Sequence, residues 1–587
     1  MRTLMVTDGT LGSVRAMVAL GCGLVKRGHK PVLVACPARF RALVEDYGLR
    51  WTAFNPAPLA PSRSFLTFAE ALEEVCRREG IDQTRDSTAT QQRTCIVGEH
   101  SSLHAAYSLA EKFAICWVGV FFAPVSPTDA HPSTAFTACP NASSSSSSPT
   151  SAPAALRLPL LPGGLALPHR RWMNKWSHLL ALALEWRSAR DAVNAWREAR
   201  LKLPPIPNAL GVLPLIKRQT LPVVHPLHPA FFAKPHDWAA ELKVPAFLFL
   251  PDKPAPAPFL SSDLRLELAA DKDNTTPSSS AVESATWEKK EDESAKEEEQ
   301  RLERFLKSSS TTEAEGAVRP LFFACGGLVD SQSSARAVLD VAARLADKTR
   351  RQVVLFIRDE DGPAKVQPAG GADGEGPTST DAAAAMTEDG DGVVDVHPGW
   401  AELIYAPGAI PDSLCVVSRL SYASILPKCS CAVIDGGHAI TAATIRAGVP
   451  LVCVPIDDRV SWFWANRAHE IGIAPQPIAR TQLTADALLQ AIDRATSAQT
   501  TQSHRLRELS AKVNADGDGV RKVVDAFERV CITSIGLVPT SDYADVSTAS
   551  ALWQELTTTE MGVALGVATG LALLIWLLLK LLFLLFL

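Results

Sequence analysis

The stretch LMVTDGTLGSVRAMVALGCGLVKRGHKPVLVA, residues 4–35, decides the fold class. A short apolar run at 4–7 leads into a glycine-containing turn, and apolar residues then recur at helical spacing as far as Val25. Gly28 ends this helix, and residues 31–35 form a second apolar run. Apolar strands that alternate with helices predict a parallel, doubly wound sheet, because the crossover helices cover both of its faces.

The same alternation continues along most of the chain. Further strands are expected at 50–54, 94–97, 115–122, 321–325, 352–357, 431–434 and 450–455. The sequence therefore predicts an α/β protein with a first doubly wound domain over 1–220, a linker over 221–260 and a second such domain over 317–535. A ligand is expected in the crevice at the carboxyl ends of the strands, between the two domains.

Three insertions interrupt this pattern. They are a Ser-, Pro- and Ala-rich stretch at 133–160, a polar and then densely charged stretch at 261–316, and a Gly-, Ala- and Asp-rich stretch at 363–392. Because they lack the apolar residues needed for a core, we expect disordered surface segments. Within the second insertion, residues 288–307 are expected to form a solvated helix or an acidic binding tail.

The C-terminal end of the sequence is strongly apolar. Residues 561–579 carry no charge, and a helix of this length spans about 28 Å, close to the hydrocarbon thickness of a bilayer. A transmembrane helix is therefore predicted over 561–583 after a linker over 536–560, with a buried or an interfacial helix as the alternatives. Since the N-terminus resembles no signal peptide, the expected localisation is a single-pass, tail-anchored protein of the endoplasmic reticulum or the outer mitochondrial membrane, with its N-terminal bulk in the cytosol.

Composition excludes several classes of protein. The 58 Lys and Arg against 63 Asp and Glu give a net charge of -5, which argues against a nucleic-acid-binding protein. Twelve cysteines in 587 residues are too few for a disulfide scaffold, and their spacing matches no zinc pattern. A dinucleotide-binding oxidoreductase is disfavoured because no G-x-G-x-x-G motif follows the first strand.

A colinear series of motifs resembles the inverting glycosyltransferases of the sterol-glucosyltransferase type, which include the antibiotic glycosyltransferases. The matching segments are residues 9–35, HAAYSLAEKFAICWVGVFFAPVSPTDAHPS at 104–133, Asn194 with Arg197 and Leu203-Pro204, PHDW at 235–238, and AVIDGGHAITAATIRAGVPLVCVPIDDRVSWFWANRAHEIGIAP at 432–475. The resemblance implies two Rossmann-like domains of the GT-B type, with the acceptor in the first and a nucleotide sugar in the second. It implies no metal and no cofactor, with a UDP-sugar as co-substrate and a lipid or sterol as acceptor.

The resemblance also implies where a donor would bind. Its diphosphate would lie on the Gly436-Gly437 turn at the start of a helix, where backbone N–H groups and the helix dipole favour an anion. The donor-binding residues predicted in this way are Asp435, Gly436, Gly437, His438, Thr441, Asp458, Arg459, Gly326 and Gly327. The acceptor-binding residues predicted are Gly12, His100 and Phe122.

Several key positions depart from the family pattern. The position of the general base, usually acidic, is Ser13, and a hydroxyl cannot deprotonate an acceptor at neutral pH without a partner. The histidine that contacts the diphosphate is replaced by Asp435, which would repel it. His438 is predicted either to offset that carboxylate or to be a surface residue at a helix cap, and Asp8 either to replace the base or to be a turn residue.

Two functions from different classes remain open at this point. The first is a membrane-tethered glycosyltransferase that moves a hexose from a UDP-sugar to a lipid or sterol hydroxyl with inversion, with Ser13 and Asp8 as the catalytic candidates. The second is a catalytically impaired relative that binds lipid or acts as a scaffold at a membrane.

Overall fold

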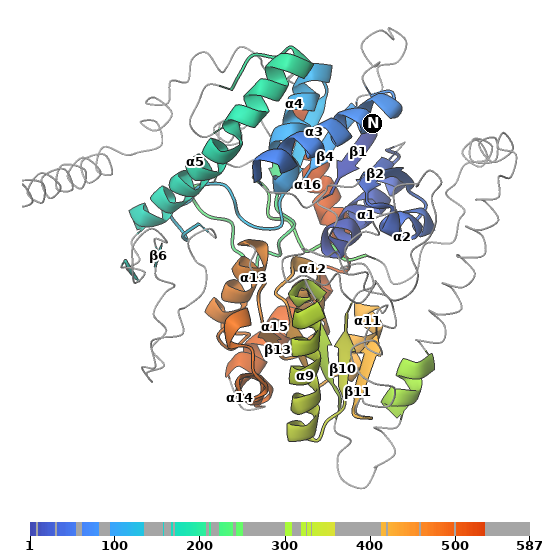
Figure 1. Cartoon of the computed structure of the whole chain (residues 1–587), viewed down its shortest axis with the longest axis vertical. Helices are drawn as coiled ribbons and strands as arrows, with labels where there is room; N and C mark the ends of the chain where they lie inside the picture. Colours follow the sequence, from blue (N-terminus) through green and yellow to red (C-terminus); the bar gives the residue numbers. More distant parts are fainter. Residues whose placement is uncertain are drawn as a thin grey trace, which may run out of the picture.

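The computed structural model of the chain describes residues 1–7, 10–29, 32–54, 61–81, 94–133, 156–157, 166–167, 171–206, 211–212, 222–238, 242–250, 300–307, 319–324, 326–329, 332–357, 412–417, 421–456, 459–497 and 501–533. These residues form two α/β lobes, drawn one above the other in Figure 1, and each lobe is built on a parallel sheet.

The first lobe contains a six-stranded sheet in the order β3-β2-β1-β4-β5-β8. Its strands are β1 (Arg2–Val6), β2 (Val32–Cys36), β3 (Arg50–Ala53), β4 (Thr94–Gly98), β5 (Cys116–Val120) and β8 (Val223–Val224). Every pairing in this sheet is parallel, and β2 and β4 are buried along their whole length. Continuous apolar strands of this kind need helices on both faces, so the predicted doubly wound fold is confirmed for this lobe.

The helices of the first lobe are α1 (Leu11–Lys26), α2 (Arg41–Asp46), α3 (Pro61–Arg78), α4 (Leu103–Phe113) and α5 (Arg171–Trp196). Short helical turns lie at Ala38–Phe40, His100–Ser102 and Arg197–Leu201, and a small separate hairpin is formed by β6 (Leu156–Arg157) and β7 (Ala166–Leu167). Thr10 caps α1, because its side chain accepts a hydrogen bond from the amide of Ser13.

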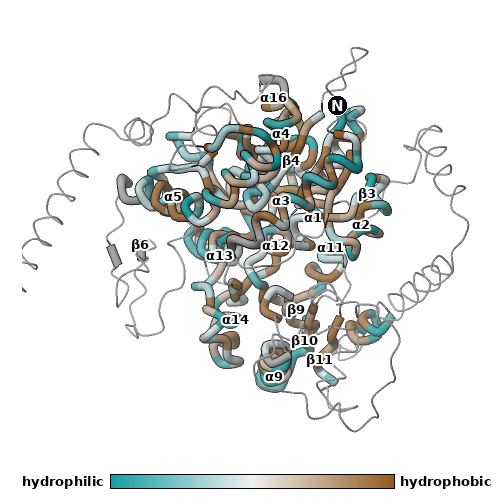
Figure 2. The backbone as a smooth tube through the Cα atoms, turned by 45° about the horizontal axis from the view of Figure 1, so that its top comes forward, coloured by the Kyte–Doolittle hydropathy of each residue, from teal (hydrophilic) through white to brown (hydrophobic). Residues whose placement is uncertain are grey.

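The second lobe contains a five-stranded parallel sheet in the order β11-β10-β9-β12-β13. Its strands are β9 (Leu321–Ala324), β10 (Val353–Phe356), β11 (Leu414–Val417), β12 (Cys431–Ile434) and β13 (Leu451–Cys453). In Figure 2, β10 and β11 are brown along their length, as expected for buried strands. The helices are α9 (Gln332–Thr349), α11 (Tyr422–Ile425), α12 (His438–Ala447), α13 (Arg459–Glu470), α14 (Ala485–Thr496) and α15 (Thr501–Ala515), with short turns at Gly326–Leu328, Leu426–Lys428 and Arg480–Gln482.

The last helix, α16 (Val520–Thr533), returns to the first lobe, where it lies against α1, β5 and β8 (Figure 1). Gly23 of α1 allows this close approach, because a Cβ there would clash with the side chain of Val520. The turn before α16 also holds the interlobe segment, since the Phe249 amide donates to the Asp518 carbonyl at 3.1 Å. The C-terminal part of the described chain therefore stabilises the N-terminal lobe.

Both sheets have the same topological switch point, which positions the candidate site. In each sheet the strand order reverses beside the first strand, between β1 and β4 in the first lobe and between β9 and β12 in the second. The ends of these strands are in register, with Val6 opposite Gly98 and Ala324 opposite Ile434. Ligands of doubly wound sheets bind at such points, because the loops after the two strands diverge there.

One part of the predicted fold is wrong. Among the described residues, no helix has both the length and the apolarity required to cross a bilayer. This finding contradicts the predicted transmembrane helix, the membrane as a partner and the tail-anchored localisation. Residues 536–560 and 561–583, on which these predictions were made, lie outside the described residues.

The insertions fall largely outside the described residues as well. This holds for 363–392, for most of 133–160, and for 261–316 apart from 300–307, which are helical. The predicted disorder of these segments stays a prediction.

The turn that leads into α16 provides a stability test with a built-in control. Gly517 and Gly519 both have φ of +68°, but a Cβ at 517 would meet nothing within 4 Å, whereas a Cβ at 519 would clash with the carbonyl oxygen of Phe247. Gly517→Ala should reduce the free energy of unfolding by about 1–2 kcal/mol because of the left-handed backbone. Gly519→Ala should cost about 1–3 kcal/mol more because of the clash. Urea denaturation measures both, and equal losses would show that the interlobe segment does not pack on this turn.

Candidate functional site

At the switch point of the first lobe, the predicted catalytic residue Ser13 meets a carboxylate. Ser13 lies in the first turn of α1 and Glu99 directly follows β4, and both are buried. The Ser13 hydroxyl donates a hydrogen bond of 2.9 Å to Oε2 of Glu99. The partner that a serine needs in order to accept a proton is therefore present, on the neighbouring strand. Asp8, the other catalytic candidate, lies outside the described residues.

Glu99 is a functional candidate that the sequence analysis missed. The sequence contains a signal for it, because an acidic residue lies two positions after the strand predicted at 94–97. This signal identifies a site residue only when β4 is known to pair directly with β1, because that pairing brings Glu99 beside the N-terminus of α1. The order of the strands, and not a motif, identifies this residue.

At the switch point of the second lobe, Asp435 occupies part of the predicted anion site. Asp435 directly follows β12 and is buried. Its Oδ1 accepts a hydrogen bond of 2.9 Å from the Gly437 amide, and a Cβ on Gly327 would lie 3.1 Å from its Oδ2. The carboxylate therefore lies between two predicted donor-binding turns and uses one of the amides expected to receive the diphosphate.

The helix after this turn still presents a positive end. The first intrahelical bond of α12 runs from the Thr441 amide to the Gly437 carbonyl at 3.0 Å, so the amides of Ala439 and Ile440 have no partner within the helix. Thr441 is buried, and its hydroxyl donates to the same Gly437 carbonyl at 2.8 Å. Gly436 has φ of +75° and lies against the Ser461 backbone, which fixes the turn. The roles of Gly326, Gly436 and Thr441 in donor binding stay predictions.

The two lobes meet at the N-terminal ends of α1 and α12. His438, the first residue of α12, stacks on Phe122 with ring centroids 3.9 Å apart and planes at 11°. A Cβ on Gly12 would lie 3.2 Å from Cε1 of His438. The Phe122 carbonyl in turn accepts a hydrogen bond of 2.8 Å from the indole of Trp464 on α13. Predicted acceptor residues Gly12 and Phe122 thus contact predicted donor residue His438 directly.

A second contact between the lobes joins the predicted site residues His100 and Arg459 through Glu185, which was not predicted. Glu185 of α5 accepts a 2.7 Å hydrogen bond from Arg459, at the start of α13, and lies 3.5 Å from Nε2 of His100. Burial opposes ionisation of Glu185, but attraction to His100 and Arg459 outweighs it and lowers the pKa of this carboxyl. The charged Glu185 therefore links Arg459, predicted for donor binding, to His100, predicted for acceptor binding. Asp458, the neighbour of Arg459, lies outside the described residues.

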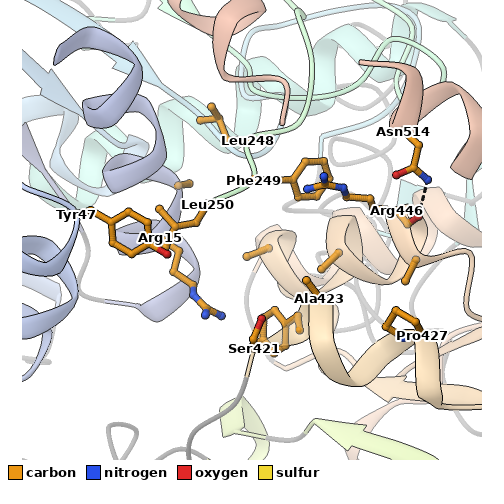
Figure 3. A pocket seen from close by; sticks show the side chains of 15 residues that line it. Arg15, Tyr47, Leu248, Phe249, Leu250, Ser421, Ala423, Pro427, Arg446 and Asn514 are labelled. Carbon is orange, nitrogen blue, oxygen red and sulfur yellow. Dashed lines mark hydrogen bonds between the residues drawn. The ribbon is translucent and has the colours of Figure 1, made fainter. Parts of the chain in front are cut away.

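A cavity of about 330 Å³ opens between the lobes (Figure 3). One wall is the face of α12 that carries Ala439, Ala443 and Ala447, and Ser421 and Tyr422, at the start of α11, also line the cavity. The opposite wall carries Arg15 and Tyr47 from the first lobe, and the interlobe segment adds Leu248, Phe249 and Leu250.

The charged side chains among the described residues that line the cavity are all positive. The guanidinium of Arg15 lies 5.0 Å from the centre of the Tyr422 ring, and that of Arg446 lies 4.6 Å from the centre of the Phe249 ring. None of the described residues that line the cavity is acidic. Two cations, the first turn of α12 and aromatic walls suit a ligand that is negatively charged and partly planar.

A potential metal ligand set lies in the loops of the first lobe. Asp129, His236 and Asp237 bring ligand atoms within 4.8 Å of one another. Asp237 already accepts hydrogen bonds from the Thr128 hydroxyl at 2.6 Å and the Asp129 amide at 2.9 Å, so its carboxylate holds these loops together. The expectation that no metal is needed stays a prediction.

The Asp435 contact predicts a gain of affinity on substitution. Asp435→Asn keeps an oxygen that accepts from Gly437 but removes a negative charge beside the anion site. Two unit charges about 4 Å apart repel by about 4 kcal/mol at an effective dielectric of 20, less with salt. We therefore expect the variant to bind inorganic pyrophosphate at least about tenfold more tightly by calorimetry. The exposed Asp493→Asn is the matched control, and unchanged affinity in Asp435→Asn would mean that anions do not bind at this turn.

Comparison with known proteins supports a relation to glycosyltransferases, although no family model matches the chain. A sterol 3-beta-glucosyltransferase of Arabidopsis thaliana is 34% identical over 138 residues, which are 24% of this chain and 22% of that protein. An O-mycaminosyltylonolide 6-deoxyallosyltransferase of Streptomyces fradiae is 24% identical over 87% of this chain and 94% of that protein. The sterol 3-beta-glucosyltransferase of Saccharomyces cerevisiae is 21% identical over 89% of this chain, which spans 34% of the yeast protein.

Among solved structures, the glycosyltransferase of kitacinnamycin aligns with 90% of this chain and 98% of its own, at 14% identity and a TM-score of 0.48. The chain thus spans only part of the sterol glucosyltransferases it matches and nearly all of the Streptomyces fradiae protein. The predicted resemblance to sterol glucosyltransferases and antibiotic glycosyltransferases is confirmed, because the Streptomyces fradiae and Saccharomyces cerevisiae proteins, which align with most of this chain, are glycosyltransferases.

Proposed function

We propose that this chain transfers a hexose from a UDP-sugar to the hydroxyl of a sterol or another lipid, with inversion at the anomeric carbon. The observation that carries the proposal is the interlobe cavity, which begins at the first turn of α12 and has Arg15 and Arg446 in its walls but no acidic residue among the described lining. The sterol and lipid acceptors rest on what the sterol glucosyltransferases among the relatives act on.

Charge and shape support a position for the donor. A diphosphate at the N-terminus of α12 would accept from the amides that precede the first intrahelical bond, where the helix dipole favours negative charge. The nucleoside would then extend into the cavity, which Tyr422 lines and where Arg15 supplies a positive charge. The hexose would lie toward Gly12 and His438, where the lobes meet.

The proton of the acceptor leaves through Ser13 and Glu99. As the acceptor oxygen attacks the anomeric carbon, its proton passes to Oγ of Ser13, and the Ser13 proton passes along the 2.9 Å hydrogen bond to Glu99. The bond between the anomeric carbon and the diphosphate oxygen breaks on the opposite side, and UDP departs with the electron pair. The positive ends of α1 and α12 lie close together at this place and stabilise the charge that develops on the diphosphate.

One observation favours a second candidate function. The Asp435 carboxylate accepts from Gly437 and adds a negative charge where the donor needs a positive field. A relative with a weakened donor site could retain the acceptor side as a lipid-binding or scaffold protein. The two candidates differ in whether a nucleotide sugar binds at all.

The decisive assay separates them with the purified full chain. UDP-glucose and other UDP-sugars are titrated by calorimetry, and transfer to sterols dispersed in detergent is followed by mass spectrometry. Saturable binding together with a glycosylated sterol of inverted configuration is the expected result. Absence of both heat and product across the common UDP-sugars would reject transfer and leave the lipid-binding candidate.

If transfer is observed, Glu99→Gln should lower kcat by about 10²- to 10⁴-fold, the usual range for loss of general-base catalysis, with little change in KM. Ser13→Ala should lower kcat as well, because it interrupts the relay. The surface variant Glu508→Gln is the control and should behave as wild type. If Glu99→Gln keeps full activity, another group, with Asp8 the first to examine, must take the proton.

A further inference from the structure

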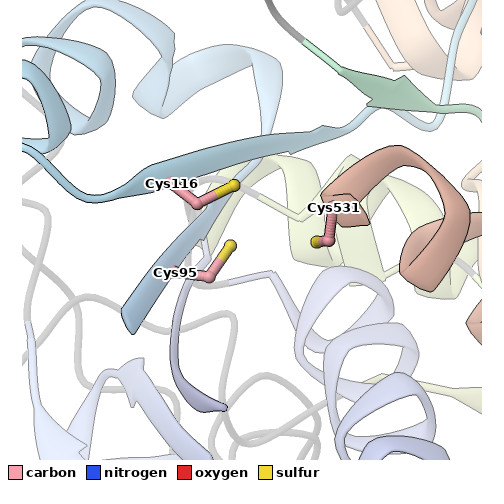
Figure 4. Close-up of side chains that lie close together, drawn as sticks. All are labelled: Cys95, Cys116 and Cys531. Atoms are coloured by element: carbon pink, nitrogen blue, oxygen red, sulfur yellow. The ribbon is translucent and has the colours of Figure 1, made fainter. Parts of the chain in front are cut away.

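Three cysteines from three different elements gather on one face of the first sheet (Figure 4). Cys95 is the second residue of β4 and Cys116 the first residue of β5, and the two are register partners in the parallel pairing. Cys531 comes from the last turns of α16, which covers this face. The three sulfur atoms all lie within 4.8 Å of one another.

The surroundings of these thiols are apolar. Cys95 is fully buried, in a cluster that also contains Val97, Val118 and Phe527. Cys116 and Cys531 are partly buried. Its place is the amino-terminal end of β4 and β5, whereas Glu99 and the candidate site follow the carboxyl end of β4. The thiols therefore have no part in the proposed transfer.

We propose that Cys95, Cys116 and Cys531 form a binding site for a monovalent copper ion. Thiolates are soft ligands that select soft ions such as Cu(I), whereas carboxylates suit harder ones. Three sulfurs bound in a plane at about 2.3 Å from a metal lie about 4.0 Å apart, so only small side-chain rotations are needed from the observed separation. Binding displaces protons from the thiols, which coordinate as thiolates.

The number of ligands favours copper over zinc. Structural zinc sites are almost always four-coordinate. Among the described residues, the ligand group here contains these three sulfurs and no histidine or carboxylate. A trigonal set of thiolates matches Cu(I), which accepts three-coordination. The sulfurs also come from rigid strands and a packed helix, so the set is largely preformed.

A bound ion would join the two ends of the described chain. Cys95 and Cys116 belong to the N-terminal sheet, whereas Cys531 belongs to the helix that follows the second lobe. Metal binding to the folded form alone stabilises it by mass action. The site would therefore fasten α16 to the sheet and, through the turn at Asp518, the segment between the lobes.

The test uses the full chain, reduced and kept free of oxygen. Cu(I) is titrated against a chromophoric chelator, and the wild type is compared with Cys531→Ser. The control is Cys22→Ser, since Cys22 is also partly buried and packs on the same cluster but lies outside the group of three. We expect Cys531→Ser to bind one Cu(I) fewer per chain and to lose the rise in melting temperature that copper gives the wild type. The control should keep both.

X-ray absorption of the copper-loaded wild type gives a result that does not depend on any variant. Three sulfur neighbours at about 2.3 Å support the site. Two sulfurs, or any nitrogen or oxygen in the first shell, would overturn it. Unchanged stoichiometry in Cys531→Ser, displacement of copper by an equal amount of Zn²⁺, or a disulfide between two of the three residues that resists the reductant would also overturn it.

Discussion

The structure depends on two helix N-termini that meet at the boundary between the lobes. Gly12 of α1 and His438 of α12 are in contact there, and a Cβ on Gly12 would lie only 3.2 Å from Cε1 of His438. Each helix starts directly after the strand at the switch point of its own sheet. The doubly wound fold, used twice, thus brings two partial positive charges to one place, which is a favourable arrangement for binding an anion.

Two carboxylates lie beside these helix ends, and they have opposite consequences. Glu99 accepts from Ser13 at the start of α1, where a proton acceptor is useful to an attacking hydroxyl. Asp435 accepts from Gly437 at the start of α12, where negative charge competes with a diphosphate. The partial positive charge at the start of each helix stabilises the carboxylate beside it. In the proposed function, Glu99 is the base on the acceptor side and Asp435 opposes the diphosphate on the donor side, and the balance of these two effects decides whether the chain turns over.

Most of the architecture could be predicted from the sequence. The strands at 94–97 and 431–434 form as expected, because short, continuous apolar runs between helices have few other ways to be buried. Glu99 could not be found in this way, since its importance depends on β4 lying next to β1, and strand order leaves no local signal. The same reason applies to Glu185, which lies in a long helix and becomes part of the site only through Arg459 of the other lobe. The transmembrane prediction was made from hydropathy alone, and no helix among the described residues supports it.

The central claim is that a donor diphosphate lies at the N-terminus of α12, opposite Ser13 and Glu99. It is tested most directly by a crystal structure of the full chain with UDP. The account predicts phosphate oxygens within hydrogen-bond distance of the Ala439 amide and the nucleoside in the cavity that Arg15 and Tyr422 line. UDP bound elsewhere on the chain, with the α12 N-terminus closed by Asp435 and His438 alone, would contradict it.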